Sequence, residues 1–219
     1  MVSTTLFTAL IAALPLALAS PIRAVVEVRD EPTFNATLEA RSAPRLITGP
    51  WQNFPAISTW LTFDDMFEKN QNSMKSTGST WDDIGRINVA IRESAKLGVD
   101  ERVILGIIMQ ESHGNVGVVT TTSPDGGKTA GLMQCTGCPG YPGQHGLSQD
   151  KITAMVKGGT QHYKQNLKNW GDKWSGESIY PALREYNSGS VNTNDLSDAR
   201  GATKTYVSDI AQRFTGWVD

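Results

Sequence analysis

The sequence predicts an α+β fold that is predominantly helical, with one polar hairpin and loop region in its middle. On both sides of that region, apolar residues recur at spacings of three and four, which is the helical period. Several of these stretches begin at a Ser, Thr or Asp residue that can cap a helix. Residues 115–147 instead contain clusters of Gly, Pro, Thr and Asp, which are typical of turns and short strands.

Three helices are expected before this central region. Thr62 and Thr80 each stand three positions before an Asp, which is the pattern of a capped helix start. Asp100 caps a third helix over residues 101–112. The apolar positions that follow the first two caps are Phe63, Met66, Phe67, Met74, Ile84, Ile87, Ile91 and Ala95.

Three more helices are expected after it, and the first of them begins at Ser148. His162 falls on the apolar side of that helix, and we interpret it as a hydrogen-bonded core histidine. The apolar positions of the three helices are Ile152, Met155, Val156, Tyr163, Leu167 and Trp170, then Ile179, Leu183 and Tyr186, and finally Tyr206, Val207, Ile210 and Phe214.

Composition narrows the class of protein. The chain has 219 residues, of which 39% are hydrophobic and 19% charged, as expected for one globular domain with processing segments. With 20 Lys+Arg against 22 Asp+Glu, the formal net charge is −2. Such a chain has no strong positive field to hold phosphates, so no nucleic-acid partner is expected.

The N-terminal segments are expected to lie outside the main domain. Residues 6–19 are apolar and end in Ala-Leu-Ala, which indicates a signal peptide over 1–19, although residues 1–5 contain no Lys or Arg. Residues 20–41 mix charge with Pro, and Asn35 begins their N-x-Thr glycosylation signal, so we expect a pro-segment or flexible arm there. The product is then secreted, extracellular and without a membrane segment; an uncleaved anchor is the alternative.

One carboxylate stands in an apolar setting. Glu111 follows Ile104, Ile107 and Ile108 by seven, four and three residues, so it shares their face of the helix. It also lies in the last turn, where the helix dipole is negative. Both effects disfavour ionisation, so we expect a raised pKa, which is what a general acid needs. The alternative is a carboxylate turned to the rim and solvated.

Three short strings follow in a fixed order: Glu111-Ser112-His113-Gly114, Gly131-Leu132-Met133-Gln134 and Tyr186-Asn187-Ser188-Gly189. Together they resemble the goose-type lysozymes and bacterial soluble lytic transglycosylases of glycoside hydrolase family 23. The resemblance spans about 80 residues from the first string to the third. It implies a lysozyme-like fold and a catalytic domain over residues 42–219.

The same resemblance implies roles for individual residues. Glu111 would protonate the glycosidic oxygen as the sugar becomes oxocarbenium-like. Tyr186 would place its hydroxyl near Glu111, unless it only packs. Gln134 and Asn187 carry amides that suit an N-acetyl group or a sugar hydroxyl. The substrate-binding residues expected in this way are Ser112, His113, Gln134, Tyr186 and Asn187.

A second carboxylate bears on the type of reaction. Asp125 lies in a Pro-Asp-Gly-Gly stretch, and the goose-type enzymes have an Asp in the same loop that positions the water of an inverting hydrolysis. Their other Asp, just after the Gly-Leu-Met-Gln string, is replaced here by Cys135 and Thr136. Asp125 as a catalytic residue therefore favours a hydrolase, whereas Asp125 as a turn former leaves a lytic transglycosylase open.

The chain has two cysteines, three positions apart. Cys135 and Cys138 are expected to form a short disulfide, because the signal peptide directs the chain to an oxidising compartment. A redox pair or half of a metal site is the alternative. The nearby His113 and His145 complete no zinc spacing, so neither a metal nor another cofactor is expected.

These observations converge on a secreted glycosidase that cleaves β-1,4 bonds beside N-acetylated sugars and acts as a monomer. Bacterial peptidoglycan is the expected substrate, and chitin oligomers stay open because the chain has little charge to attract an anionic wall. A lytic transglycosylase and a sugar-binding effector without activity are the other candidates. The tryptophans at 51, 60, 170, 174 and 217 are either sugar platforms or core residues.

Overall fold

The structure, a computed structural model, describes residues 44–122 and 126–219. The expected signal peptide (1–19), the arm (20–41) with Asn35, and Asp125 lie outside the described residues. Two 3₁₀ turns come first, η1 (Trp51–Asn53) and η2 (Ile57–Thr59). The α-helices are α1 (Phe63–Ser76), α2 (Trp81–Ala95), α3 (Glu101–Ser112), α4 (Gln149–Asn169), α5 (Gly176–Ser188) and α6 (Tyr206–Phe214).

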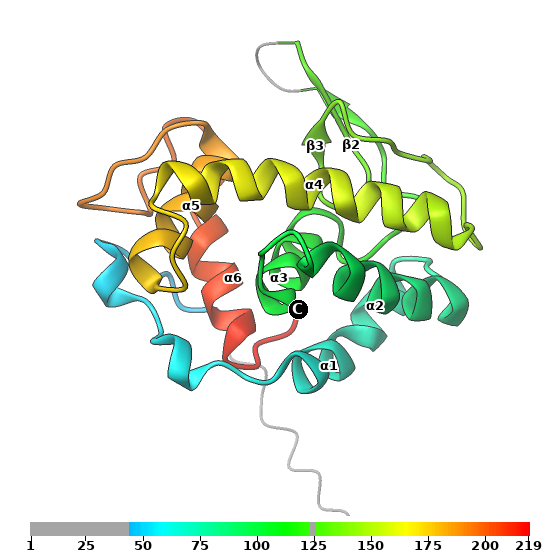
Figure 1. The fold of residues 1–219 in the computed structure, drawn as a ribbon, viewed down its shortest axis with the longest axis horizontal. Helices are drawn as coiled ribbons and strands as arrows, with labels where there is room; N and C mark the ends of the chain where they lie inside the picture. The colour runs from blue at the N-terminus through cyan, green and yellow to red at the C-terminus, as the bar shows by residue number, and fades with distance from the viewer. Residues whose placement is uncertain (1–43, 123–125) are drawn as a thin grey trace, which may run out of the picture. The chain divides into compact units, whose positions relative to one another are not determined.

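A small antiparallel sheet interrupts the helices between α3 and α4 (Figure 1). Its strands are β1 (Thr121–Thr122), β2 (Lys128–Ala130) and β3 (Cys135–Thr136), in the order β1-β2-β3. Thr121 pairs with Thr129, and Ala130 pairs with Cys135. The predicted α+β fold, predominantly helical with a central polar hairpin, is confirmed.

The capped starts expected from the sequence are present. The Thr62 hydroxyl accepts a hydrogen bond from the Asp65 amide, and the Asp100 carboxylate accepts one from the Arg102 amide. Thr80 and Asp83 form a reciprocal capping box, in which each side chain accepts a bond from the other's backbone N–H. These bonds satisfy amides that the first helical turn leaves unpaired, which is why the helices begin at these residues.

Helix α3 is the centre of the core. Every residue from Val103 to Met109 is buried. Figure 1 shows α3 in the middle, with α4 crossing it, α6 on one side and α2 on the other, and α3 contacts all three as well as α1. A helix that is apolar on nearly all sides needs such complete cover, and it gains about 1.5–3 kcal/mol for each large side chain removed from water.

Close contact between α3 and α6 depends on Gly106. A Cβ atom at this position would lie 2.9 Å from Ile210 Cγ2 and 3.1 Å from Phe214 Cε1, both on α6. Any larger residue would push α6 away from α3. The spacing of these two helices matters for the site described below, because each carries one partner of its central hydrogen bond.

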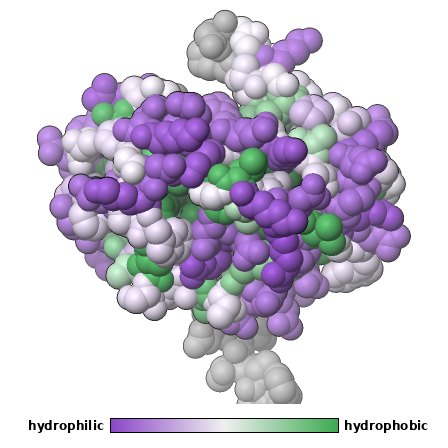
Figure 2. Space-filling model, viewed as in Figure 1, coloured by the Kyte–Doolittle hydropathy of each residue, from purple (hydrophilic) through white to green (hydrophobic). Residues whose placement is uncertain are grey.

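The surface carries no large apolar area on the face that Figure 2 shows, where hydrophilic residues predominate and apolar ones are dispersed. The exposed large apolar residues of the described chain lie on separate elements, for example Val119 before β1 and Trp174 before α5. Within residues 44–122 and 126–219, no helix has the length and apolar composition needed to cross a membrane.

Asp83 joins α2 to the end of the central region. Its carboxylate is fully buried and accepts bonds from the amides of Gly146 (2.8 Å) and Leu147 (2.9 Å), in addition to Thr80. Burial alone would raise the pKa of this carboxyl, but the hydrogen bonds outweigh burial and hold the pKa below its usual value. Asp83 therefore fixes the loop that leads into α4.

We expect Asp83→Ala to lower the free energy of unfolding by about 2–4 kcal/mol, because one helix cap and two buried amides lose their acceptor. The lowered pKa in the folded state means that this stabilisation is present at neutral pH and is lost as the pH falls through the acid range. Urea unfolding at several pH values measures it. Asp82→Ala is the matched control, because that side chain is 81% exposed and its nearest partner, Arg86, is 3.8 Å away; an equal loss there would contradict the assignment.

Candidate active site

Glu111 lines a cleft of about 600 Å³ that lies among the sheet, α4 and α5. A cleft of this size and polarity can hold a sugar-sized group, because ligand pockets usually measure about 300–1,000 Å³. The other lining residues are Thr121, Thr129, Gln134, Thr136, His162, Asn166, Glu185, Tyr186, Asn187, Ser188 and Gly189.

The carboxyl of Glu111 has a pKa that is raised toward neutral pH. Glu111 stands in the last turn of α3 and is half-buried, next to a helix interior that is fully buried. Burial raises its pKa from 4.5 to about 7, and a hydrogen bond from Tyr206 opposes part of that rise. The pKa shift has the direction that the sequence predicted, and burial is its main cause. A carboxyl of this kind can give up or take a proton near neutral pH.

The residue that orients Glu111 is Tyr206. Its hydroxyl donates to Glu111 Oε1 over 2.7 Å, and its side chain is buried at the first position of α6. The sequence pointed instead to Tyr186, whose hydroxyl donates to the backbone oxygen of Met133 over 2.7 Å. Among the described residues, no hydrogen bond joins Tyr186 to Glu111, so Tyr206 and not Tyr186 fixes the position of the carboxyl. Tyr186 nevertheless lies near enough to Glu111 for the carboxylate charge to raise its pKa.

The Gly131-to-Gln134 segment forms one wall of the cleft. Gly131 has a positive φ of 72°, and a Cβ there would lie 2.4 Å from Pro139 O, so glycine is required. Leu132 and Met133 are buried in the core. The Gln134 amide donates to Gly131 O over 3.0 Å and to Val119 O over 3.3 Å, and its oxygen accepts from Thr121 over 3.1 Å. Both the amide nitrogen and the amide oxygen of Gln134 therefore already form hydrogen bonds within the hairpin region.

Asn187 joins α5 to the chain that leads into α6. Its amide oxygen accepts from the Thr203 amide over 3.1 Å and from the buried guanidinium of Arg184. No hydrogen bond joins its Nδ2 to another residue of the described chain, and Asn187 lines the cleft. Asn187 thus has a donor left for a ligand, whereas its oxygen serves the fold.

Two expected substrate-binding residues do not line the cleft. Ser112 is buried, and its hydroxyl lies 3.0 Å from Ile108 O and 2.8 Å from Leu132 O, where it ties α3 to the following wall. His113 ends α3 with a positive φ of 50°, and its Nδ1 lies 2.6 Å from Asp219. The left-handed turn directs the chain away after Glu111, so neighbours in sequence do not share its surroundings.

Three cleft residues were missed or misassigned by the sequence. His162, expected in the core, is exposed and lines the cleft, where its ring centre lies 4.9 Å from that of Tyr186. Burial lowers its pKa, and the negative charge of Glu185 opposes this. Asn166 and Glu185 line the same cleft. The helical spacing of His162 and Asn166, four residues apart, was the signal that could have placed them on one face.

Cys135 and Cys138 are paired just after the Gly131-to-Gln134 segment, with Cα atoms 5.4 Å apart, as disulfide geometry requires.

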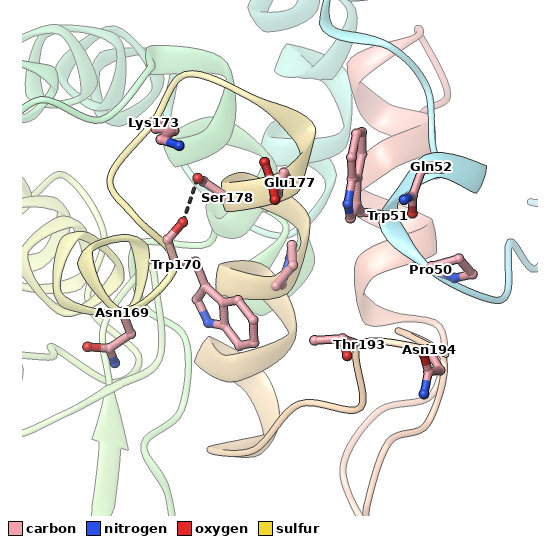
Figure 3. A pocket seen from close by; sticks show the side chains of 11 residues that line it. Pro50, Trp51, Gln52, Asn169, Trp170, Lys173, Glu177, Ser178, Thr193 and Asn194 are labelled. Carbon is pink, nitrogen blue, oxygen red and sulfur yellow. Dashed lines mark hydrogen bonds between the residues drawn. The ribbon is translucent and has the colours of Figure 1, made fainter.

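Beside the cleft, a second pocket of about 490 Å³ contains two of the tryptophans considered above, Trp51 and Trp170 (Figure 3). The Ser178 hydroxyl donates to Trp170 O over 2.6 Å and fixes this rim. Trp60, by contrast, is buried in the core against Phe214.

In the part of the chain that the structure describes, no group of three or more His, Cys, Asp or Glu side chains is placed to hold a metal ion. The described cleft presents the carboxyl of Glu111 with amide and hydroxyl groups around it.

The chain was compared with models of known protein families. The model described as "Transglycosylase SLT domain" matches residues 88–208, which is more than half of the chain. The matched region runs from α2 to α6 and contains Glu111, Gln134, Tyr186 and Tyr206.

The raised pKa of Glu111 predicts how stability depends on pH. The folded state keeps the Glu111 proton up to about pH 7, whereas the unfolded chain loses it near 4.5, so the wild type loses stability as the pH rises through this interval. We expect Glu111→Gln, which stays neutral, to be more stable than the wild type above about pH 8 by on the order of 1–3 kcal/mol. Thermal unfolding as a function of pH measures the difference, which should vanish below about pH 4. A difference that does not change with pH would contradict the shifted pKa.

Proposed function

Because this chain belongs to the transglycosylase SLT domain family, we propose that it is a secreted enzyme that cleaves the β-1,4 bonds of peptidoglycan, with Glu111 as general acid. The observation that carries the proposal is the carboxyl of Glu111, which has a pKa of about 7 and lines a cleft of about 600 Å³. A protonated carboxyl in a sugar-sized cleft is what cleavage of a glycosidic bond requires.

The reaction begins with one proton transfer from Glu111. Glu111 donates its proton to the bridging oxygen, the bond from that oxygen to C1 breaks, and the sugar that keeps C1 becomes oxocarbenium-like. When the nucleophile is a hydroxyl of that same sugar, it bonds to C1 and loses its proton to the Glu111 carboxylate, which restores the starting state. Tyr206 holds Oε1 throughout, so the other oxygen, Oε2, is the one that handles the proton.

Two nucleophiles are compatible with the first proton transfer. With water, the enzyme is a lysozyme-like inverting hydrolase: Asp125 is the candidate residue that positions the water on the opposite face of the sugar and takes its proton, and Glu111 regains its own proton from solvent. With a hydroxyl of the sugar itself, the enzyme is a lytic transglycosylase and the product is an anhydro sugar. The description of the matched family favours the second route. Chitin oligomers are an alternative substrate, because the groups that line the cleft recognise N-acetylated sugars without requiring a peptide.

The remaining expectations form part of the same proposal. Secretion rests on the apolar segment 6–19 with its small-residue end, and modification of Asn35 rests on its sequon. In an oxidising compartment, Cys135 and Cys138 form a disulfide that pins the end of the wall after Gln134. The enzyme acts as a monomer.

We expect Glu111→Gln to reduce the clearing of a peptidoglycan suspension at least about 100-fold, because the amide cannot supply the proton. Glu68→Gln, which removes an exposed carboxylate on α1, is the control and should clear walls like the wild type. Mass spectrometry of the products separates a reducing end, from hydrolysis, from an anhydro end. Equal clearing by the wild type and Glu111→Gln would refute the role of Glu111, and binding without clearing by either would indicate a sugar-binding effector.

A second variant tests the orientation of the acid. Tyr206→Phe removes the bond that lowers the pKa of Glu111, so the alkaline limb of the pH–rate profile should move to higher pH. The rate at its optimum should fall about tenfold, because the carboxyl loses its fixed rotamer. Tyr186→Phe is the comparison: its hydroxyl bonds to Met133, so its limb should keep the wild-type midpoint. If both variants shift the limb equally, Tyr206 has no special relation to Glu111.

A further inference from the structure

One side of the cleft is formed by a group of three residues from α4 and α5, namely His162, Asn166 and Glu185, here called the Glu185 group. His162 and Asn166 are four residues apart on α4; Asn169 is the last residue of that helix, and Trp170 follows it as the C-cap. None of these residues takes part in the proton transfers proposed for Glu111. Burial and the hydrogen bond from Tyr206 set the pKa of Glu111. The charge of Glu185 acts instead on the pKa of His162.

The carboxylate of Glu185 is fixed in place but has no cation beside it. Its Oε1 accepts from Asn169 Nδ2 over 2.8 Å, and its Oε2 accepts from Trp170 Nε1 over 2.6 Å. Both donors are neutral. Among the ion pairs of the described residues, none involves Glu185. A half-buried carboxylate held by neutral donors keeps free lone pairs and an unbalanced charge, which a bound cation would neutralise.

Asn166 supplies a second, independent acceptor. Only 7% of this residue is exposed, and its Oδ1 is buried without a hydrogen-bond partner in the described chain. A buried amide oxygen without a donor costs about 1–3 kcal/mol, so a ligand that donates to Asn166 from the cleft would remove that cost.

His162 completes the group without competing for the same ligand. Although the residue is exposed on one side, the protein around the rest of its ring removes water and lowers the pKa of the imidazole, which favours the neutral ring; the charge of Glu185 opposes this shift. A neutral ring carries one acceptor nitrogen and leaves the charge of Glu185 uncompensated. The ring also packs against Tyr186, whose hydroxyl donates to Met133 O.

We propose that the Glu185 group binds a protonated primary amine of the substrate chain, with Glu185 as its counter-ion and Asn166 as a second acceptor. The polysaccharide that carries the amine is taken from the proposed function, and the binding of the amine rests on the three residues themselves. A sugar hydroxyl would satisfy Asn166 but not the charge of Glu185, whereas an ammonium group supplies three donors and the missing positive charge.

The amine has two possible sources in an amino-sugar polymer. One is a glucosamine unit that has lost its acetyl group, and the other is a free amine on a peptide attached to the chain. Both present the same ammonium group, so the structure assigns the chemistry and the experiment assigns the source.

The test measures binding by calorimetry in the Glu111→Gln background, so that no chain is cut. The sugar arm compares chitosan tetramer with fully N-acetylated chitin tetramer. The peptide arm compares a peptidoglycan fragment that has a free peptide amine with the same fragment after acetylation of that amine. Each arm is run with Glu185 intact, with Glu185→Gln, and with Glu68→Gln as the matched loss of one exposed carboxylate.

We expect the protein with Glu185 intact to prefer the amine-bearing probe in at least one arm, and added salt to weaken that preference. Glu185→Gln should weaken binding of that probe about tenfold and leave the acetylated probe unchanged, whereas Glu68→Gln should change neither. The arm that responds identifies the source. Equal affinity for free and acetylated amines in both arms overturns the proposal, and so does an equal loss for both probes in Glu185→Gln.

The preference shown with Glu185 intact needs no variant at that position, so it decides the question even if Glu185→Gln folds poorly. The result is also separable from the proposed function. Clearing of walls that depends on Glu111, together with indifference to the amine, overturns this inference alone. A clear amine preference in a protein that never clears walls overturns the enzymatic proposal and leaves the amine site standing.

Discussion

The hydrogen bond between Tyr206 and Glu111 is the interaction on which the site depends. It joins the end of α3 to the start of α6 over 2.7 Å, across 95 positions of sequence. It forms only because Gly106 lets the two helices approach closely. The same packing buries the carboxyl and raises its pKa, while the hydroxyl limits that rise and fixes the rotamer. Core packing and acid strength are therefore one property of this fold.

Residues of the three short sequence strings form hydrogen bonds that tie neighbouring segments of the chain together. Ser112 bonds to Leu132, Tyr186 bonds to Met133, and Gln134 bonds to Thr121. Each bond connects two separate segments of the chain next to the cleft through a backbone or side-chain oxygen. Such residues preorganise the site, because a carboxyl is useful to a transition state only if its surroundings do not have to rearrange.

The two sides of the cleft differ in chemistry. On the α3 side, burial raises the pKa of the Glu111 carboxyl to about 7. On the α4–α5 side, the Glu185 carboxylate accepts hydrogen bonds from two neutral donors, Asn169 and Trp170. Those two donors also line the neighbouring pocket with Trp51, so the two hollows adjoin there. In the roles proposed above, one of these two carboxyl groups transfers a proton and the other binds a positive charge.

The sequence alone determined the helices and the setting of Glu111, because caps such as Thr80 and the apolar face of α3 are local patterns within a few residues. Only tertiary packing decided which tyrosine meets Glu111, that Ser112 and His113 turn away, and that His162 faces the cleft. The physical reason is that these contacts join segments far apart in the chain. Periodicity reports which face of a helix is apolar but not which neighbour will cover it.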